Sequence, residues 1–298
     1  MAMEMADLGF SQIELSHGIR IILVPGLLKA IEEKVISVVS THNFCPLPAG
    51  INQAAPNLFE PSSRYARERE QWVRHTKRSI EFAAQVGAGA VVCHLGGIDF
   101  FWANPAEKLR RWINAQGSPQ AFAQPLFASM RDRTMERIQK RLPLYWNSLI
   151  ESINRIEPLA REKHVRLGFE NRERLEELPI DSDFGRLFEA LGPDSSGGYW
   201  HDTGHAELKH RNGLIDHQKH LETLASRLIG FHLHDVNAGG EDHQPIGSGS
   251  VDFSMISSFW QPHHTLVLEL SPGASPGDVV ESRQRIEALL ASRGFTFR

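Results

Sequence analysis

The chain has few of the features that mark secreted or membrane-bound proteins. Its 298 residues include only two cysteines, Cys45 and Cys93, which form no CxxC pair. Both lie in or beside apolar, strand-like runs, so we expect reduced, partly buried thiols and a cytoplasmic protein. No apolar run approaches the ~20 residues that span a bilayer. The N-terminal segment MAMEMADLGF lacks the apolar region of a signal peptide, so we expect neither a membrane anchor nor export.

An excess of positive charge is also missing. The formal net charge is -4 at pH 7, whereas proteins that bind nucleic acid non-specifically carry a basic surface. The composition therefore disfavours a nucleic-acid partner without excluding a local basic groove. The hydrophobic content of 41% and the charged content of 23% are ordinary for a globular protein. The length suits one large α/β domain, which we expect to occupy residues 1–298.

Short β-type runs alternate with longer helical ones along the chain, which is typical of βα units and a parallel sheet. Most of the β-type runs are continuously apolar, as expected for strands covered on both faces. The predicted strands are 11–15, 35–41, 89–95, 165–171, 197–202, 228–235 and 265–270. Helices are predicted over 64–86 and 142–160, the second bent or interrupted by Pro158, and after the cap Ser275-Pro276. The pattern predicts a (β/α)8 TIM barrel.

Only seven strands can be identified where such a barrel has eight. The chain opens with MAMEMADLG, which is typical of a helix end leading into the strand 11–15. We therefore expect the first strand to be missing from this chain or replaced by something irregular.

Two long segments follow predicted strands. The proline-rich segment 42–63 is expected to frame the mouth of the barrel. The segment 96–141 begins with Phe100, Phe101 and Trp102. It is equally compatible with a lid or substrate wall and with an extra helix packed on the barrel.

Acidic residues and histidines stand at the ends of the predicted strands. They are His42, His94, Glu170 with Asn171, Asp202, His232 with His234 and Asp235, and Glu269. Because a parallel barrel places the C-terminal ends of its strands on one face, these side chains are expected to converge there. A single acid at a strand end is more often a cap or a salt-bridge partner, but a succession of them indicates a site.

Four of these residues suit a metal ion. Glu170, Asp202, His232 and Glu269 are separated by 32, 30 and 37 residues, about one βα unit each. Three carboxylates and one imidazole form a mostly oxygen site that suits Mn²⁺, Mg²⁺ or Co²⁺, and also Zn²⁺. His205 follows Asp202 by three residues, and His243 lies in a loop closed by Pro245 and glycines. For His42, His94, His205 and His243, contact with a ligand and a purely structural hydrogen bond both remain open.

The ordered set of segments LGFSQIEL, VVCHLGG, GFEN, DTGH, HLHD, HQPIGSGSVDF and ELSP resembles the xylose isomerase-like TIM-barrel superfamily. That superfamily contains sugar isomerases and epimerases and also endonuclease IV. The resemblance covers nearly the whole chain and implies one divalent metal ion held by Glu170, Asp202, His232 and Glu269. It further implies that His94, His205, His42 and Glu14 line the substrate pocket. Glu176 is spaced after Glu170 like a substrate-side glutamate of ketose epimerases, and we add His243 and Trp102 from the adjoining loops as substrate-binding candidates.

The resemblance implies a sugar isomerase or epimerase of carbohydrate metabolism. Glu170 and Glu269 would exchange protons with a sugar-like substrate through a metal-stabilised enediolate, while Asp202 and His232 would act mainly as ligands. The sequence has no glycine-rich loop for phosphate, so a free sugar, keto acid or cyclitol is as compatible as a sugar phosphate. Barrels of this superfamily often pair, which makes a homodimer compatible as well.

Two other functions stay open. An endonuclease IV-like hydrolase with several zinc ions would use His42, His94, Glu170, Asp202, His205, His232, His243 and Glu269. It would also need an aspartate, for which only Glu241 or Asp242 is placed, and the chain lacks an evident run of basic and aromatic residues to insert into a duplex. A non-catalytic sugar-binding barrel is the third hypothesis. The complete set of ligands opposes it, because buried acids without a metal ion are unfavourable.

Overall fold

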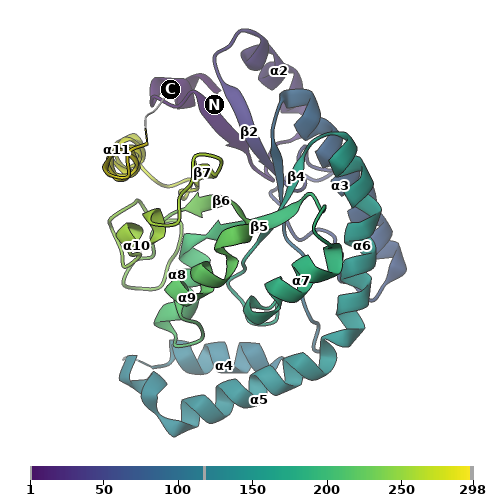
Figure 1. The fold of residues 1–298 in the computed structure, drawn as a ribbon, viewed down its shortest axis with the longest axis vertical. Coiled ribbons are helices and arrows are strands. Elements are labelled where there is room, and N and C mark those ends of the chain that lie inside the picture. Colours follow the sequence, from purple (N-terminus) through teal and green to yellow (C-terminus); the bar gives the residue numbers. More distant parts are fainter. Residues whose placement is uncertain (1, 117–118, 296–298) are drawn as a thin grey trace.

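The structure is a computed structural model, and it describes residues 2–116 and 119–295. Its centre is one sheet of seven parallel strands in chain order, curved so that helices cover its outside (Figure 1). The strands are β1 (Gln12–Leu15), β2 (Ser37–His42), β3 (Ala90–Cys93), β4 (Arg166–Glu170), β5 (Gly197–Asp202), β6 (Leu228–Leu233) and β7 (Thr265–Leu268). Each predicted strand matches one observed strand, with ends that differ by two residues at most. The α/β barrel with seven recognisable strands is therefore confirmed.

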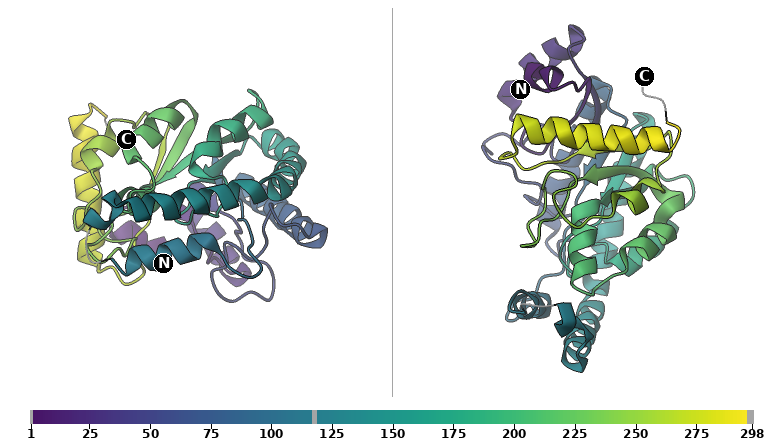
Figure 2. Two further views of the ribbon diagram at one scale, coloured as in Figure 1. Left: turned by 90° about the horizontal axis from the view of Figure 1, so that it is seen from below. Right: turned by 90° about the vertical axis from the view of Figure 1, so that its left-hand side faces the viewer.

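The helices lie between the strands in sequence (Figures 1 and 2). They are α1 (Ala2–Asp7), α2 (Val24–Glu32), α3 (Ala66–Val86), α4 (Pro105–Asn114), α5 (Pro125–Arg141), α6 (Pro143–Glu162), α7 (Phe184–Leu191), α8 (Thr203–Arg211), α9 (His217–Leu224), α10 (Phe253–Ser257) and α11 (Pro276–Ser292). Short 3-10 turns occupy Ile21–Leu23, Pro119–Ala123, Asp181–Asp183 and Ala225–Arg227. None of the described helices is both long and apolar enough to cross a membrane.

The helix ends confirm two capping predictions and correct one expectation. Gly87 ends α3 in the left-handed conformation, at φ 78°, and Ser275 forms a capping box with Asp278 at the start of α11. Pro158, however, does not interrupt α6, which continues to Glu162. The buried face of α6 packs along α3, and this packing holds the helix together across the hydrogen bond that the proline removes.

The first strand of an eight-stranded barrel is absent from the described residues. The short helix α1 precedes β1, as the sequence predicted, and no described strand pairing joins β1 to β7. These two edge strands are less buried than the central ones: β7 is half-buried throughout, and only Leu15 of β1 is buried. The sheet still curves far enough for Glu14 on β1 to contact His232 on β6. The barrel is therefore nearly closed, with a seam between β1 and β7.

Alternating side chains divide the core into an outer and an inner part. On β3, Val91 and Cys93 join the large apolar cluster, whereas Ala90 and Val92 join a small cluster around Trp200. Because successive residues of a strand point to opposite faces, the small cluster fills the inside of the barrel. Gly230 makes room for the indole, since a Cβ there would lie 2.3 Å from the Trp200 ring. This packed interior lies beneath the strand ends that carry the polar site.

The segment after β3 forms an extra layer beside the barrel. Helices α4 and α5 lie side by side along the lower edge of Figure 1. Leu109, Ile113 and Phe127 bury a small apolar cluster that includes Leu175 and Leu214 from the barrel. These helices pack on the barrel, as one of the two alternatives for the segment 96–141 expected, and α4 also lines a cavity.

Candidate metal centre

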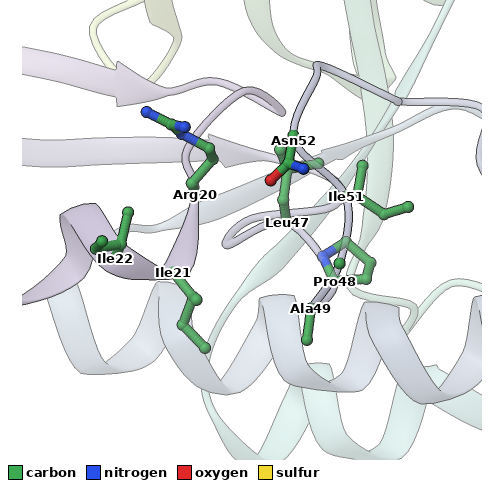
Figure 3. Close-up of a pocket in the computed structure, with 9 residues that line it drawn as sticks. Arg20, Ile21, Ile22, Leu47, Pro48, Ala49, Ile51 and Asn52 are labelled. Atoms are coloured by element: carbon green, nitrogen blue, oxygen red, sulfur yellow. The ribbon is translucent and has the colours of Figure 1, made fainter.

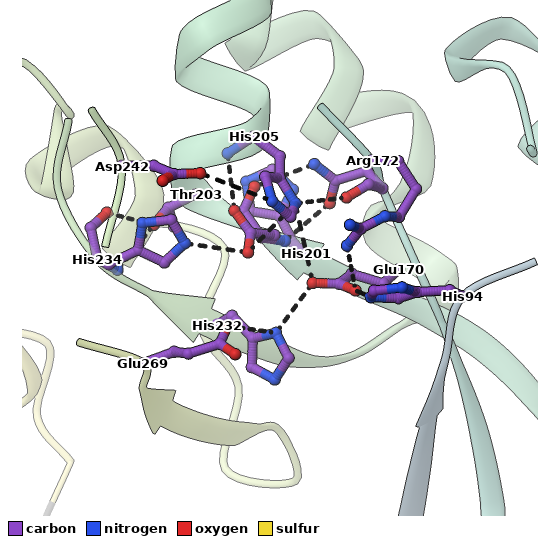
Figure 4. Close-up of polar contacts among 12 residues, drawn as sticks. His94, Glu170, Arg172, His201, Thr203, His205, His232, His234, Asp242 and Glu269 are labelled. Atoms are coloured by element: carbon purple, nitrogen blue, oxygen red, sulfur yellow. Dashed lines mark hydrogen bonds and ion pairs between the residues drawn. The ribbon is translucent and has the colours of Figure 1, made fainter. Parts of the chain in front are cut away.

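The four predicted ligands converge at the C-terminal ends of their strands. One donor atom from each of Glu170, Asp202, His232 and Glu269 lies within 4.8 Å of the others. Glu170, Asp202 and His232 are buried, at 2%, 0% and 0% exposure. The Glu269 side chain is 26% exposed, so the site opens towards solvent on its side. Figure 4 shows the side chains of Glu170, His232 and Glu269 close together at the strand ends.

His232 is held between carboxylates on both sides of its ring. Its Nδ1 lies 3.0 Å from Glu170 Oε1 and 3.1 Å from Glu269 Oε2. Its Nε2 lies 3.0 Å from Glu14 Oε1. Burial lowers the pKa of His232, but Glu269 and Glu14 outweigh it and raise the pKa well above its usual value. The contact with Glu14 fixes the orientation of the His232 ring and leaves Nδ1 directed at Glu170 and Glu269.

Glu14 therefore lies behind a ligand rather than along the pocket wall. The register between β1 and β2 shifts between Ile13 and Glu14, and a bulge of this kind re-aims the side chain that follows it. The other carboxylate oxygen of Glu14 accepts a hydrogen bond from Ser40 Oγ at 2.6 Å. With both oxygens bound, Glu14 supports His232 instead of facing a substrate.

Asp202 is fixed by three neighbours. Its Oδ1 accepts the His205 backbone N–H at 2.7 Å as the cap of α8, and its Oδ2 lies 3.0 Å from His234 Nε2. The Asn171 side chain brackets its peptide groups: Oδ1 accepts the Asp202 N–H at 2.7 Å, and Nδ2 donates to the Asp202 carbonyl at 3.0 Å. Burial raises the pKa of Asp202, but the His205 and His234 imidazoles outweigh it, and the pKa lies below its ordinary value. The carboxylate is therefore ionised and positioned to hold a cation.

The two oxygens of Glu170 face different partners. Oε1 faces His232, whereas Oε2 lies 2.8 Å from His94 Nε2, 2.8 Å from the Arg172 guanidinium and 3.7 Å from His42 Nε2. Burial raises the pKa of Glu170, but Arg172 and His94 outweigh it, and the pKa lies well below its usual range. Glu170 is thus a carboxylate that can bind a cation through one oxygen while a guanidinium holds the other.

The remaining histidines surround this cluster. His42, His94 and Glu170 form a second group of potential ligands, and His234, His243 and Glu269 form a third. His243 stacks on His234 with ring centroids 4.2 Å apart. Burial lowers its pKa, but Asp242, Asp202 and Glu269 raise it to about 9. His205 lies 3.3 Å from Asp202 Oδ2 and 3.8 Å from Asp242.

Three other predicted features fall at the rim or outside the cluster. The loop 42–63 frames the site as expected, because Asn57 Oδ1 contacts His94 Nδ1 at 2.7 Å. Glu176 bonds to Asn104 Nδ2 at 2.6 Å and lines a neighbouring cavity. Trp102 is 92% exposed and packs edge-on against Phe101; no described contact joins it to the metal cluster. Asn104 anchors α4 to the barrel, whereas Phe101 and Trp102, which precede it, are exposed to solvent.

A cavity of about 960 Å³ lies between α4 and the segments that follow β4, β5 and β6, and none of the four candidate ligands lines it. Its walls carry charged groups of both signs, including Glu107, Arg110, Glu173, Arg174 and Glu207. Such a lining suits a ligand with many hydroxyl groups better than an apolar one. A smaller cavity of about 250 Å³ lies between Arg20–Ile22 and Leu47–Asn52, and none of the four candidate ligands lines it (Figure 3).

Asp235 ends a predicted strand without joining the metal cluster. Its carboxylate accepts the backbone N–H groups of Val236, Gly247, Gly249 and Val251 at 2.8 to 3.0 Å. A Cβ at Gly249 would lie 2.0 Å from the Val236 carbonyl, so only glycine fits this approach. Asp235 closes the loop that carries Asp242 and His243.

Comparison with known protein families gives a match over most of the chain. The family model described as "Xylose isomerase-like TIM barrel" matches residues 3–261. The search of curated proteins returned no match.

Several solved structures share the fold at low sequence identity. An L-ribulose 3-epimerase superposes with a TM-score of 0.65 at 14% identity, covering 97% of this chain and 87% of its own. The 3-keto-D-glucoside 4-epimerase from E. coli has a TM-score of 0.63 at 14% identity, covering 95% and 91%. A xylose isomerase-like TIM barrel protein from Mycobacterium smegmatis, solved in complex with magnesium, has a TM-score of 0.58 at 16% identity, covering 98% and 87%.

Proposed function

The chain belongs to the xylose isomerase-like TIM-barrel family, and we propose that it is a divalent-metal-dependent isomerase or epimerase acting on a sugar-like small molecule. The observation that carries the proposal is the convergence of Glu170, Asp202, His232 and Glu269 on one point at the mouth of the barrel. Solved structures with this fold include sugar epimerases and a magnesium complex.

The donor set fits one hard divalent cation. Three carboxylates held within 4.8 Å of one another and of an imidazole repel each other unless a cation lies among them. Glu170 Oε1, Asp202, His232 Nδ1 and Glu269 would hold the ion. When bound, it would supply a Lewis acid that polarises a carbonyl and offsets the negative charge left when a neighbouring proton departs.

Two carboxylates are placed to move that proton. Glu170 is buried and ionised, so it can accept a proton, and Glu269 approaches from the half-open side of the site. His94 Nε2 and His205 Nδ1 contact Glu170 and Asp202 at the edge of the cluster, where they would hold these carboxylates in place. The polar cavity that includes Glu173, three residues after Glu170, would offer room for the rest of a sugar.

The second candidate is a hydrolase of phosphodiesters with several metal ions. It is favoured by the group His42, His94 and Glu170, which shares Glu170 with the first group. Arg172 opposes it, because its guanidinium lies 2.8 Å from the same Glu170 oxygen that a second cation in this group would bind. This contact favours one ion over three.

Metal content and proton exchange test the proposal together. We expect about one Mn²⁺, Mg²⁺, Co²⁺ or Zn²⁺ per chain in the purified protein by plasma mass spectrometry. With a panel of ketoses and keto-glycosides in deuterated water, we expect deuterium to enter at the carbon beside the carbonyl. Glu170→Gln should lower the exchange rate by at least ~100-fold, since amide nitrogen cannot serve as a base, while the exposed Glu189→Gln on α7 should not change it.

Other outcomes would point elsewhere. Fully active Glu170→Gln would refute the assigned base. Three zinc ions per chain together with cleavage of abasic DNA would favour the hydrolase. If the protein bound no metal even after metal was added, the result would favour a sugar-binding barrel without catalytic activity.

A further inference from the structure

A second cluster of buried titratable groups lies behind the metal centre, outside the proposed chemistry. On β5, Asp202 points into the barrel, and the alternation of a strand sends Tyr199 and His201 to the helix-covered face. There they contact His220 and His217 of α9, and His217 contacts Glu207 of α8. Asn171, Tyr199 and His201 are 0% exposed, His217 is 2% and Glu207 is 5%. Buried polar groups of this kind need a hydrogen for every contact.

The contacts form one continuous path. Tyr199 Oη lies 3.0 Å from Asn171 Oδ1, 2.7 Å from His201 Nδ1 and 2.9 Å from His220 Nε2. His201 Nε2 lies 3.0 Å from His217 Nε2, and His217 Nδ1 lies 3.4 Å from Glu207 Oε2. At its inner end, Asn171 brackets the peptide groups of Asp202 and accepts from His205 Nδ1 through its carbonyl at 3.0 Å.

Several hydrogens on this path have only one arrangement. Asn171 Oδ1 accepts from Asp202 N–H, because Nδ2 donates to the Asp202 carbonyl. Burial raises the pKa of Glu207, but His217 and Ser250 outweigh it, so Glu207 is a carboxylate and His217 Nδ1 must carry a hydrogen. Only Tyr199 can supply the hydrogen between its hydroxyl and Asn171 Oδ1, because that amide oxygen can only accept.

The Tyr199 hydroxyl has one hydrogen, and its direction follows from its three contacts. If it pointed at His201 Nδ1 or at His220 Nε2, the Tyr199 oxygen and Asn171 Oδ1 would face each other at 3.0 Å with no hydrogen between them. If it points at Asn171 Oδ1, His201 donates from Nδ1 and His220 donates from Nε2. This second arrangement gives each of the three contacts one hydrogen.

We propose that Tyr199 is a positioning residue for the metal centre: it donates to Asn171, which clamps the candidate ligand Asp202, and the ring N–H groups of His201 and His220 fix the direction of this donation. The functional consequence of this inference depends on the proposed metal site. The arrangement of hydrogens does not, because it exists in the metal-free protein. Glu207 also lines the large cavity, so the path joins the cavity wall to a metal ligand.

The first test reads the hydrogens directly in metal-free protein. Long-range ¹⁵N NMR of histidine-labelled wild type should show a hydrogen on His201 Nδ1 and a hydrogen on His220 Nε2. Spectra of His201→Asn and His220→Asn assign the two signals by their loss. A His201 Nδ1 without a hydrogen in the wild type would overturn the proposal.

The second test measures positioning. Tyr199→Phe should speed hydrogen exchange of the peptide that contains Asp202 in metal-free protein, and should weaken Mn²⁺ binding by about tenfold, the lower end for a group that supports a metal ligand. The matched control is Tyr145→Phe, since Tyr145 is 1% exposed and, among the described residues, its hydroxyl contacts the Asp99 carbonyl alone, at 3.3 Å. Equal exchange in the two variants would overturn the proposal. Absence of Mn²⁺ binding by the wild type would refute the proposed function alone, because the exchange result still decides the role of Tyr199.

A double-mutant cycle separates positioning from general loss of structure. Because Tyr199 acts through Asn171, Tyr199→Phe should leave the Mn²⁺ dissociation constant and the exchange rate unchanged in an Asn171→Ala background. Additive effects of the two substitutions would show that Tyr199 acts by another route and would contradict the proposal.

Discussion

At the scale of single residues, Glu60 offers a test of electrostatics at the barrel mouth. Its carboxylate accepts the Gly97 N–H at 3.2 Å. Burial, together with the nearby Asp99, raises its pKa from 4.5 to about 7. The folded protein therefore holds the Glu60 proton more tightly than the unfolded chain does. The stability this gives is fully present below pH 4.5 and is lost as the pH rises through about 7.

Glu60→Gln keeps the shape of the side chain without the charge. We expect the variant and the wild type to have similar free energies of unfolding at pH 5. At pH 8 the variant should be more stable by about 1–3 kcal/mol, because it avoids burying a carboxylate. Urea unfolding at both pH values measures the difference. A difference that does not change with pH would contradict the prediction.

The sequence located most of the site, but it could not assign each residue a role. Strand-end positions identified Glu170, Asp202, His232 and Glu269, since parallel strands force these ends together. Glu14 was expected in the pocket, and a bulge in β1 turned it behind His232 instead. Arg172 was missed because it lies in the charged run NRER, which resembles any solvated loop, and only the fold shows its guanidinium buried against Glu170.

At the scale of elements, the segment after β3 depends on one cap. The Asn104 side-chain oxygen accepts the N–H groups of Ala106 and Glu107 at the start of α4, and its nitrogen donates to Glu176 at 2.6 Å. Asn104→Ala should lower the free energy of unfolding by about 1–2 kcal/mol. Asn104→Ser should lower the free energy of unfolding by a smaller amount, because serine caps the helix but is too short to hold Glu176. Thermal unfolding checks the order, and equal losses in the two variants would show that the cap contributes nothing.

Elements differ in how well the sequence predicts them. The strands were predicted within two residues, because each is a short apolar run between polar segments. The arrangement of residues 96–141 could not be predicted, because the local sequence does not decide whether amphipathic helices cover the site or pack beside it. Leu175 and Leu214 decide it by completing the apolar cluster of α4 and α5, and this contact between distant segments has no signature in the sequence. The same lack of distant information explains why the exposure of Trp102 could not be predicted, because it follows from where the segment folds.

At the scale of the whole molecule, the seam between β1 and β7 leaves one side of the barrel without strand pairing. The edge strand β7 is half-buried along its length, and Glu269, directly after it, is the most exposed of the four candidate ligands. Ligands on β4, β5 and β6 belong to the well-packed part of the sheet. A cation bound by all four would therefore tie the edge strand to the centre, in addition to any chemistry it supports.

This arrangement predicts how the fold responds to metal. Mn²⁺ at 100 times its dissociation constant should raise the free energy of unfolding by about 2.7 kcal/mol and the melting temperature by several degrees, and a chelator should reverse both. Hydrogen exchange should slow in β7 and in the loop carrying Asp242 and His243, but not in α4 and α5, which contact the barrel elsewhere. Glu269→Gln should abolish most of the slowing in β7, whereas the exposed Glu189→Gln should preserve it. Equal slowing across the whole chain would show that the ion stabilises the fold without binding at the edge strand.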